Sequence, residues 1–165
     1  MTIHMFLVGY VVAARLTELG LSLRNTRHLL AAGAHEVGRR HYPVVVLFQI
    51  SWIISLRVMV PDATPPMLLF LALFVLVQIV RFWTVRSLGE RWTTRIIVVP
   101  GRKLITDGPY RWVRHPSYLV VAGEIALLPL VFGAWKLALG FSIVNAILLS
   151  YRIRVEERAL APHQP

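Results

Sequence analysis

The stretch PMLLFLALFVLVQIVRFW, residues 66–83, decides the fold because it is apolar over almost its whole length. An α-helix rises about 1.5 Å per residue and the hydrocarbon core of a bilayer is roughly 30 Å thick, so a run of this kind crosses a membrane. Four more apolar runs lie at about 3–23, 43–60, 117–132 and 137–155. We therefore expect an all-α integral membrane protein with about five transmembrane helices, formed as one domain over residues 1–165.

The positive charges support this number of spans. Most of the 18 Lys and Arg residues lie between the first and second runs, between the third and fourth, and after the fifth. Five spans put all three segments on one side of the membrane, whereas four or six would scatter them. Because basic segments stay in the cytoplasm, we expect an outside N-terminus and a cytoplasmic C-terminus, with the basic side of the protein facing the cytoplasm.

Composition excludes several classes of function. A formal net charge of +10 suits a nucleic-acid-binding protein only when the charges share one solvated face, and here apolar runs separate them. The chain has no cysteine, which rules out disulfides, thiolate metal sites and cysteine nucleophiles. We expect neither a nucleic-acid partner nor a metal ion.

Residues 84–116 form a loop that is too long for a simple connection, and loops of this length are usually functional or disordered. Its regularly placed aromatic and aliphatic residues argue against disorder, so we expect it to fold over the cytoplasmic ends of the helices. At its end, Pro116 occupies the first position of the fourth span. A helix N-terminus favours anions, so Arg114 and His115 mark a candidate anion site; contact with lipid headgroups alone explains them equally well.

Two acidic positions outside this loop are also candidates. Arg152 and Glu156 lie four residues apart on one helical face, where they can pair. An acid there also suits ribose hydroxyls or a cation, although a solvated helix end is the simpler explanation.

Charges within the spans are costly in hydrocarbon and need a reason. Arg15 and Glu18 lie three residues apart and can neutralise each other. Glu124, inside the fourth span, is either a functional carboxylate or a packing contact to Gln78 or Asn145.

Two separated segments carry a family resemblance: GPYRWVRHPSY at 108–118 and RIRVEERAL at 152–160. Together they resemble the isoprenylcysteine carboxyl methyltransferase family, integral membrane enzymes that use S-adenosylmethionine. The resemblance extends from about Trp83 to Leu160. The segment RNTRHLLAAGAHEVG at 24–38 is similar to a bacterial branch whose members methylate alkylpyrones or alkylresorcinols and are encoded with type III polyketide synthases.

The resemblance implies a set of cofactor-binding residues on the long loop, the start of the fourth span and the C-terminal helix. They are Arg95, Arg102, Lys103, Leu104, Ile105, Tyr110, His115, Pro116, Ser117, Tyr118 and Glu156. It places Arg152 on the substrate side as a catalytic residue. Tyr118 and Glu156 must then meet around one nucleoside. Glu124 is a second candidate catalytic residue, a general base that only a weakly acidic acceptor such as a phenol requires.

The chain departs from the eukaryotic members, because it is much shorter and has fewer spans. A prenylated protein is therefore a less suitable substrate than a small lipid. The chain also has no Gly-x-Gly-x-x-Gly loop, which argues against a Rossmann-type methyltransferase.

We expect S-adenosylmethionine-dependent O-methyl transfer to a lipophilic small molecule that enters from the bilayer, with an alkylpyrone or phenolic polyketide lipid favoured. One alternative is an isoprenylcysteine or isoprenoid carboxyl methyltransferase. The other is a non-catalytic transporter or assembly subunit, although the sequence shows no inverted repeat of the kind transporters often carry.

Overall fold

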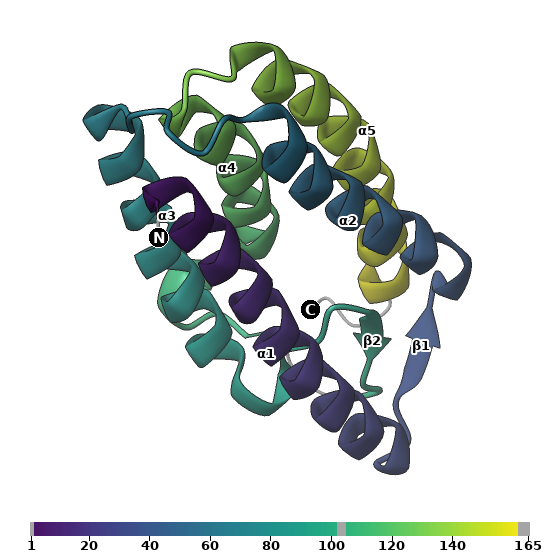
Figure 1. The fold of residues 1–165 in the computed structure, drawn as a ribbon. Helices are drawn as coiled ribbons and strands as arrows, with labels where there is room; N and C mark the ends of the chain where they lie inside the picture. Colours follow the sequence, from purple (N-terminus) through teal and green to yellow (C-terminus); the bar gives the residue numbers. More distant parts are fainter. Residues whose placement is uncertain (1, 102–104, 162–165) are drawn as a thin grey trace.

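The computed structural model describes residues 2–101 and 105–161. Within them lie five α-helices: α1 (Ile3–Ala31), α2 (Tyr42–Met59), α3 (Leu68–Leu88), α4 (Pro116–Val131) and α5 (Trp135–Leu160) (Figure 1). Four of these are long and apolar enough to cross a membrane, and α4 is a shorter apolar helix. The expected all-α membrane fold is confirmed, while its orientation in the membrane stays a prediction.

Three helices continue beyond the ends that hydropathy marks. α1 reaches Ala31 rather than 23, α3 reaches Leu88 rather than 83, and α5 reaches Leu160 rather than 155. Apolar composition marks where lipid contact ends, whereas a helix continues as long as its backbone hydrogen bonds are satisfied. The polar extension of α1 is tied down by Asn25, whose Nδ2 donates to the carbonyls of Gly89 and Trp92.

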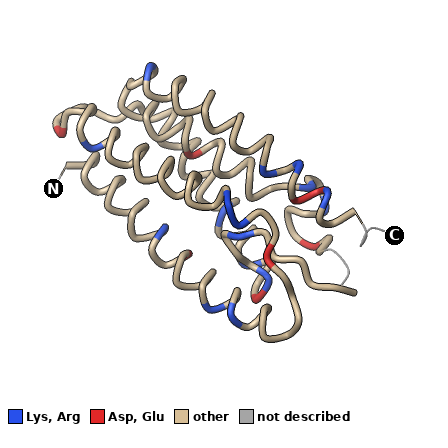
Figure 2. Tube along the Cα trace, turned by 90° about the vertical axis from the view of Figure 1, so that its right-hand side faces the viewer, with Lys and Arg blue, Asp and Glu red and all other residues tan. Residues whose placement is uncertain are grey.

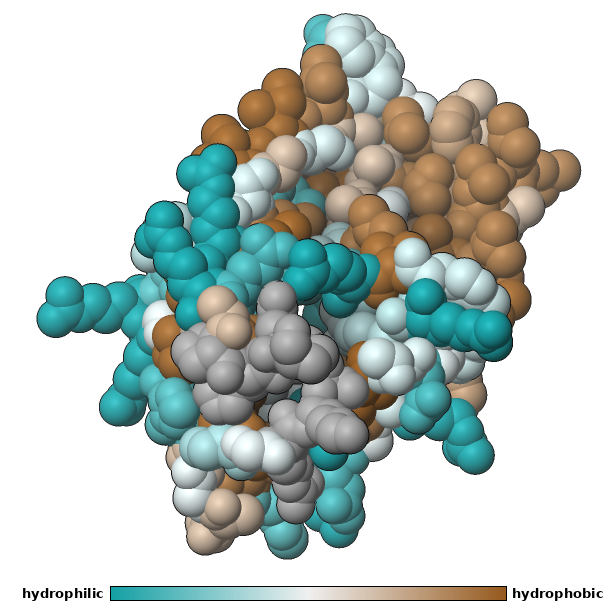
Figure 3. All heavy atoms as spheres, turned by 180° about the vertical axis from the view of Figure 1, so that it is seen from behind, coloured by the Kyte–Doolittle hydropathy of each residue, from teal (hydrophilic) through white to brown (hydrophobic). Residues whose placement is uncertain are grey.

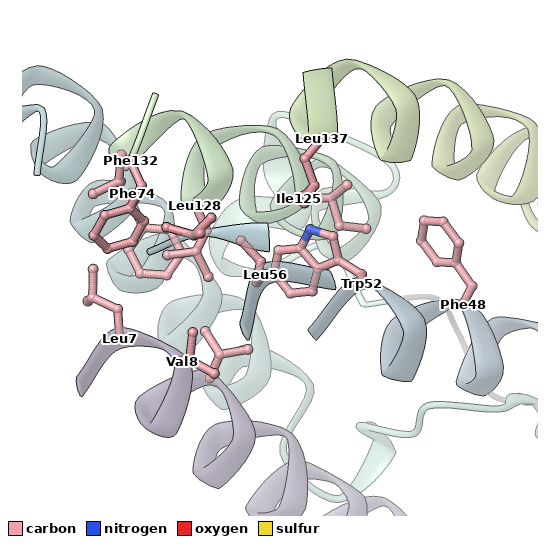
Figure 4. Close-up of a cluster of buried hydrophobic side chains, with 13 residues drawn as sticks. Leu7, Val8, Phe48, Trp52, Leu56, Phe74, Ile125, Leu128, Phe132 and Leu137 are labelled. Carbon is pink, nitrogen blue, oxygen red and sulfur yellow. The ribbon is translucent and has the colours of Figure 1, made fainter. Parts of the chain in front are cut away.

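The core lies between the helices, where Trp52 of α2, Phe74 of α3 and Leu128 of α4 are almost completely buried (Figure 4). Helices α3 and α4 approach closely because Gly123 presents no side chain toward Val77. Many outward side chains are large and apolar, such as Val58 and Leu68. Brown, apolar side chains cover one part of the surface in Figure 3 and teal, hydrophilic ones gather at another. A bilayer accounts for an apolar surface of this extent.

A small antiparallel sheet joins the two polar loops. β1 (His35–Val37) pairs with β2 (Ile96–Val98), with Glu36 opposite Ile97 (Figure 1). The sequence analysis did not predict this sheet, because strands of three residues are too short to show alternation. The pairing holds the long loop against the chain segment between α1 and α2.

The rest of the long loop is ordered by short 3-10 turns, η2 (Gly89–Arg91) and η3 (Gly108–Arg111). A glycine is required where η3 docks on α3. Gly108 has a φ of +60°, and a Cβ at this position would lie 2.1 Å from Oγ of Ser87. The backbone of η3 can therefore approach α3 only with no side chain at residue 108.

Most Lys and Arg residues gather toward the end of the molecule that holds the loops and the C-terminal part of α5 (Figure 2). Arg57 lies in the last turn of α2, away from the loop end, and forms an ion pair of 3.3 Å with Asp62, which follows the helix. This charge asymmetry agrees with the distribution expected from the sequence.

Candidate active site

A cavity of about 820 Å³ extends from the long loop into the space between the helices. Its described lining comes from all five helices and from the β2 and η3 segments. Its loop end is polar and contains Tyr118, Arg152 and Glu156, while aliphatic side chains line much of the rest. A space of this size is sufficient for a small-molecule ligand.

Tyr118 is the centre of a hydrogen-bonded chain at the loop end of the cavity. Its hydroxyl donates to Oε2 of Glu156 at 2.6 Å and accepts from Nε of Arg152 at 3.3 Å. Arg152 also donates through Nη2 to the carbonyl of Thr94. The start of α4, the end of α5 and the segment before β2 are thereby held together. Arg152 and Glu156 share one helical face, and both hydrogen-bond to the hydroxyl of Tyr118.

His115 lies beside the same group as the residue preceding α4. Its ring stacks on that of Tyr118, with centroids 5.5 Å apart. Nδ1 lies 3.7 Å from Oε2 of Glu156, and Nε2 lies 3.5 Å from Oε1 of Glu157. Nε2 is nevertheless buried without a hydrogen-bond partner among the described residues. The ring therefore has a polar atom available to a ligand.

Tyr110 of η3 lines the cavity next to Ser117, and their hydroxyl oxygens are 2.9 Å apart. Burial raises the pKa of Tyr110 to about 12, against the opposing effect of its hydrogen bond with Ser117. Tyr110 is therefore neutral at physiological pH, and it can offer a hydrogen bond and an aromatic face but no negative charge.

Arg95 lies in the wall formed by the loop, directly before β2. Its Nη1 donates to both carboxylate oxygens of Glu36, at 3.0 and 2.9 Å, and its guanidinium lies 4.8 Å from the ring centre of Tyr42. Thr94 is held by a hydrogen bond with Ser22, in which Oγ of Ser22 lies 2.9 Å from Oγ1 of Thr94. These contacts fix the backbone to which Arg152 donates.

The other predicted cofactor residues differ in position. Ile105 and Ser117 line the cavity, whereas Pro116 is buried at the start of α4 and is not among the described lining residues. Arg102, Lys103 and Leu104 lie outside the described residues. The structure thus brings together Arg95, Ile105, Tyr110, His115, Ser117, Tyr118, Arg152 and Glu156 around one cavity.

Glu124 belongs to a second polar group deeper in the helices. It accepts from Nη2 of Arg15 at 2.5 Å, from Nε2 of Gln78 at 2.8 Å and from Nη1 of Arg81. Arg81 also donates twice to Glu18, and the predicted pair of Arg15 with Glu18 is present at 3.4 Å. We call Arg15, Glu18, Arg81 and Glu124 the ionic cluster. Glu124 is 2% exposed and is not among the described lining residues.

Sequence reasoning missed several residues of both groups. Arg81 was assigned only to the basic side of the membrane, although its position inside an apolar run already indicated a buried partner. Glu36 and Thr94 carry no local signal, because their roles depend on the pairing of β1 with β2 and on the approach of α5.

Comparison with known proteins identifies the family of the chain. The sequence profile of the isoprenylcysteine carboxyl methyltransferase (ICMT) family matches residues 69–162, which include Tyr118, Arg152 and Glu156. The chain belongs to the isoprenylcysteine carboxyl methyltransferase family. It is accordingly a membrane methyltransferase, of a family that generally uses S-adenosylmethionine.

Two relatives extend the similarity over nearly the whole chain. YpbQ of Bacillus subtilis (strain 168), described as an uncharacterized protein, is 40% identical over 158 residues, covering 93% of this chain and 94% of its own. An uncharacterized protein of Haemophilus influenzae (strain ATCC 51907 / DSM 11121 / KW20 / Rd) is 26% identical over 159 residues, covering 92% and 91%. No solved structure matches the chain significantly.

Proposed function

We propose that this member of the family is an S-adenosylmethionine-dependent O-methyltransferase whose acceptor is a lipophilic small molecule, with an alkylpyrone or phenolic polyketide lipid favoured. One observation carries the proposal. The polar group of Tyr118, Arg152 and Glu156 shares a single cavity with apolar residues whose outer surfaces are exposed on the lipid-facing helices.

The residues at the loop end fit the cofactor. A carboxylate such as Glu156 suits ribose hydroxyls, and the unpartnered Nε2 of His115 suits the carboxylate of the amino acid portion. Tyr110 and Ile105 provide an aromatic and apolar surface for adenine. When bound, S-adenosylmethionine supplies an electrophilic methyl group on a sulfonium. The protein then has to orient the acceptor and exclude water.

The apolar part of the cavity supports a lipid acceptor. Leu16 of α1 and Ile54 of α2 both line it, and their side chains are 63% and 56% exposed. Exposed apolar side chains on both helices at the cavity wall favour an opening between α1 and α2. At this level the exterior is hydrocarbon, and an alkyl chain can therefore extend through the opening while its head group remains inside.

The polar groups favour an acceptor that is already acidic. The described lining carboxylates are Glu18, Glu156 and Glu157. Glu18 and Glu156 accept hydrogen bonds from Arg81 and Tyr118, and Oε1 of Glu157 lies 3.5 Å from Nε2 of His115, while Tyr110 keeps its proton. Arg152, by contrast, brings a positive charge to the cavity wall. An enol or carboxylic acid that ionises near neutral pH needs charge stabilisation more than a general base. Arg152 is suited to hold such an anion.

The test uses purified protein in lipid nanodiscs with methyl-labelled S-adenosylmethionine. A 4-hydroxy-6-alkyl-2-pyrone, a 5-alkylresorcinol, an isoprenoid carboxylic acid and a prenylcysteine are supplied separately. We expect labelled methyl ether from the pyrone at a rate well above that of the isoprenoid acid and the prenylcysteine, and a slower reaction of the less acidic resorcinol. Preferred labelling of the prenylcysteine or the isoprenoid acid would overturn the polyketide assignment. Absence of cofactor binding would overturn the proposal itself.

A further inference from the structure

The ionic cluster borders the ligand space, because three of its four side chains face the cavity. Arg15, Glu18 and Arg81 line its wall, and Glu124 lies behind them. Charged groups inside a membrane are costly, and an ionisable side chain there is by default a candidate functional residue.

The hydrogen bonds in the cluster occupy the carboxylate oxygens more fully than the guanidinium donors, above all on Arg15. Oε1 and Oε2 of Glu18 accept from Arg81, and Oε1 and Oε2 of Glu124 accept from Gln78, Arg15 and Arg81. Each carboxylate oxygen is thus occupied. Arg81 uses Nε and both terminal nitrogens in these contacts.

A guanidinium has five N–H donors, and Arg15 uses fewer of them than Arg81 does in hydrogen bonds among the described residues. Its Nη2 donates to Glu124, its Nη1 makes a long contact of 3.4 Å with Glu18, and its Nε is buried without a hydrogen-bond partner among the described residues. Its side chain retains 20% exposure, compared with 8% for Arg81. Arg15 therefore lines the cavity wall with a partly exposed guanidinium whose N–H groups are not all paired among the described residues.

The position of the cluster relative to the loop end indicates what can supply that atom. Glu124 follows Tyr118 on α4 by six residues, which places it about 9 Å deeper along the helix. The side chains of Arg15 and Arg152 are long, so their guanidinium groups can lie closer together than the backbone positions do. A head group that reaches the loop end with one oxygen can therefore present another oxygen to Arg15.

We propose that Arg15 is an acceptor-binding residue that donates hydrogen bonds to a second oxygen of the acceptor head group, one that is not methylated. This inference rests on the proposed function and adds the recognition of a two-oxygen head group to it. Arg152 holds the reacting oxygen, Arg15 holds the other, and the alkyl chain leaves between α1 and α2.

The experiment compares a 5-alkylresorcinol with a 3-alkylphenol of the same chain length, which differ by one hydroxyl. Acceptor binding and turnover are measured for the wild type, Arg15→Gln, Arg15→Lys and Arg57→Gln. Arg57 pairs with Asp62 and is not among the described lining residues, so it is the matched control. In Arg15→Gln, Glu124 keeps Gln78 and Arg81 as partners, which preserves the local fold.

We expect the wild type and Arg57→Gln to bind the resorcinol at least tenfold more tightly than the phenol. Arg15→Gln should lose this preference, raise KM for the resorcinol about tenfold and keep its cofactor affinity within twofold. Arg15→Lys, which keeps the charge but not the forked donors, should lie between them.

Equal preference in Arg15→Gln and wild type would overturn the inference, as would a wild type that binds neither acceptor or binds both equally. Methyl transfer tests the proposed function, whereas acceptor binding tests the role of Arg15. A wild type that prefers the resorcinol through Arg15 but transfers no methyl group would contradict the proposed function and leave the binding assignment supported.

Discussion

The hydroxyl of Tyr118 donates a hydrogen bond of 2.6 Å to Oε2 of Glu156, although 38 residues separate them in sequence. This contact joins the first turn of α4 to the last part of α5, at the loop end of the cavity. The same hydroxyl accepts from Arg152. One tyrosine thus positions both the proposed cofactor acid and the proposed acceptor-binding arginine.

Replacing this hydroxyl should weaken cofactor binding. Tyr118→Phe removes both hydrogen bonds while keeping the ring against His115. Since each such bond contributes about 0.5–1.5 kcal/mol net, we expect S-adenosylmethionine affinity to fall about tenfold in calorimetry. Tyr151→Phe, at an exposed position on α5, is the control and should bind as the wild type does. Unchanged affinity in Tyr118→Phe would contradict the placement of the cofactor at Glu156.

Arg152 should matter for the acceptor more than for the cofactor. In Arg152→Gln we expect methyl transfer to fall at least a hundredfold, because a charge-assisted bond to an acceptor anion contributes about 1.5–3 kcal/mol and positioning is lost as well. Cofactor affinity should change by less than threefold. Labelled methyl transfer and calorimetry on the same preparations separate the two effects.

Arg154→Gln is the control on the same helix, at an exposed position that is not among the described cavity-lining residues. If both arginine variants lose activity equally, Arg152 has no specific role in holding the acceptor.

Gly108→Ala should loosen the docking of η3 on α3. Its φ of +60° and a Cβ only 2.1 Å from Oγ of Ser87 combine backbone strain with a clash. We expect a loss of about 1–3 kcal/mol in stability, read as a lower midpoint of thermal unfolding in detergent. Gly133 also has a positive φ, of +67°, but a Cβ added there would meet nothing within 4 Å. Gly133→Ala therefore measures the cost of backbone strain without a clash.

A double variant, Gly108→Ala with Ser87→Ala, removes the clashing oxygen and should recover part of the loss. No recovery would mean that strain, rather than the contact with Ser87, accounts for the effect.

Glu124 is predicted to stabilise the helices. Glu124→Ala leaves Arg15 and Arg81 with a single carboxylate partner inside the membrane, and losing one member of a buried ion pair costs about 3–5 kcal/mol. We expect a marked fall in the unfolding midpoint, while Glu90→Gln, at an exposed position, should leave it unchanged.

The general-base role of Glu124 stays a prediction, and Glu124→Gln tests it. Because the carboxylate is buried behind two arginines, we expect this variant to methylate an acidic pyrone at close to the wild-type rate once folded. A loss confined to phenolic acceptors would instead support a general base.

Parts of the candidate site were accessible from sequence because their signals are local. His115-Pro116 predicts the start of a helix, and the spacing of Arg152 and Glu156 places both on one helical face. The proximity of those two segments came from the family resemblance rather than from the residues. Nothing local indicated that Tyr118 would bridge them, since a tyrosine in an apolar helix is usually an interfacial or packing residue.

The sequence by itself determined that the chain lies in a membrane, approximately where its helices cross it, and which end collects the positive charge. The spans follow from the free energy of transferring each segment from water to hydrocarbon, and the charged end follows from the placement of basic residues between the spans. Only the tertiary structure decided that Arg81 pairs with Glu18 and Glu124, that β1 pairs with β2, and that one cavity connects Arg15 with Arg152. Those contacts join residues far apart in the chain, and they depend on how the helices pack against one another rather than on the preference of any segment for lipid.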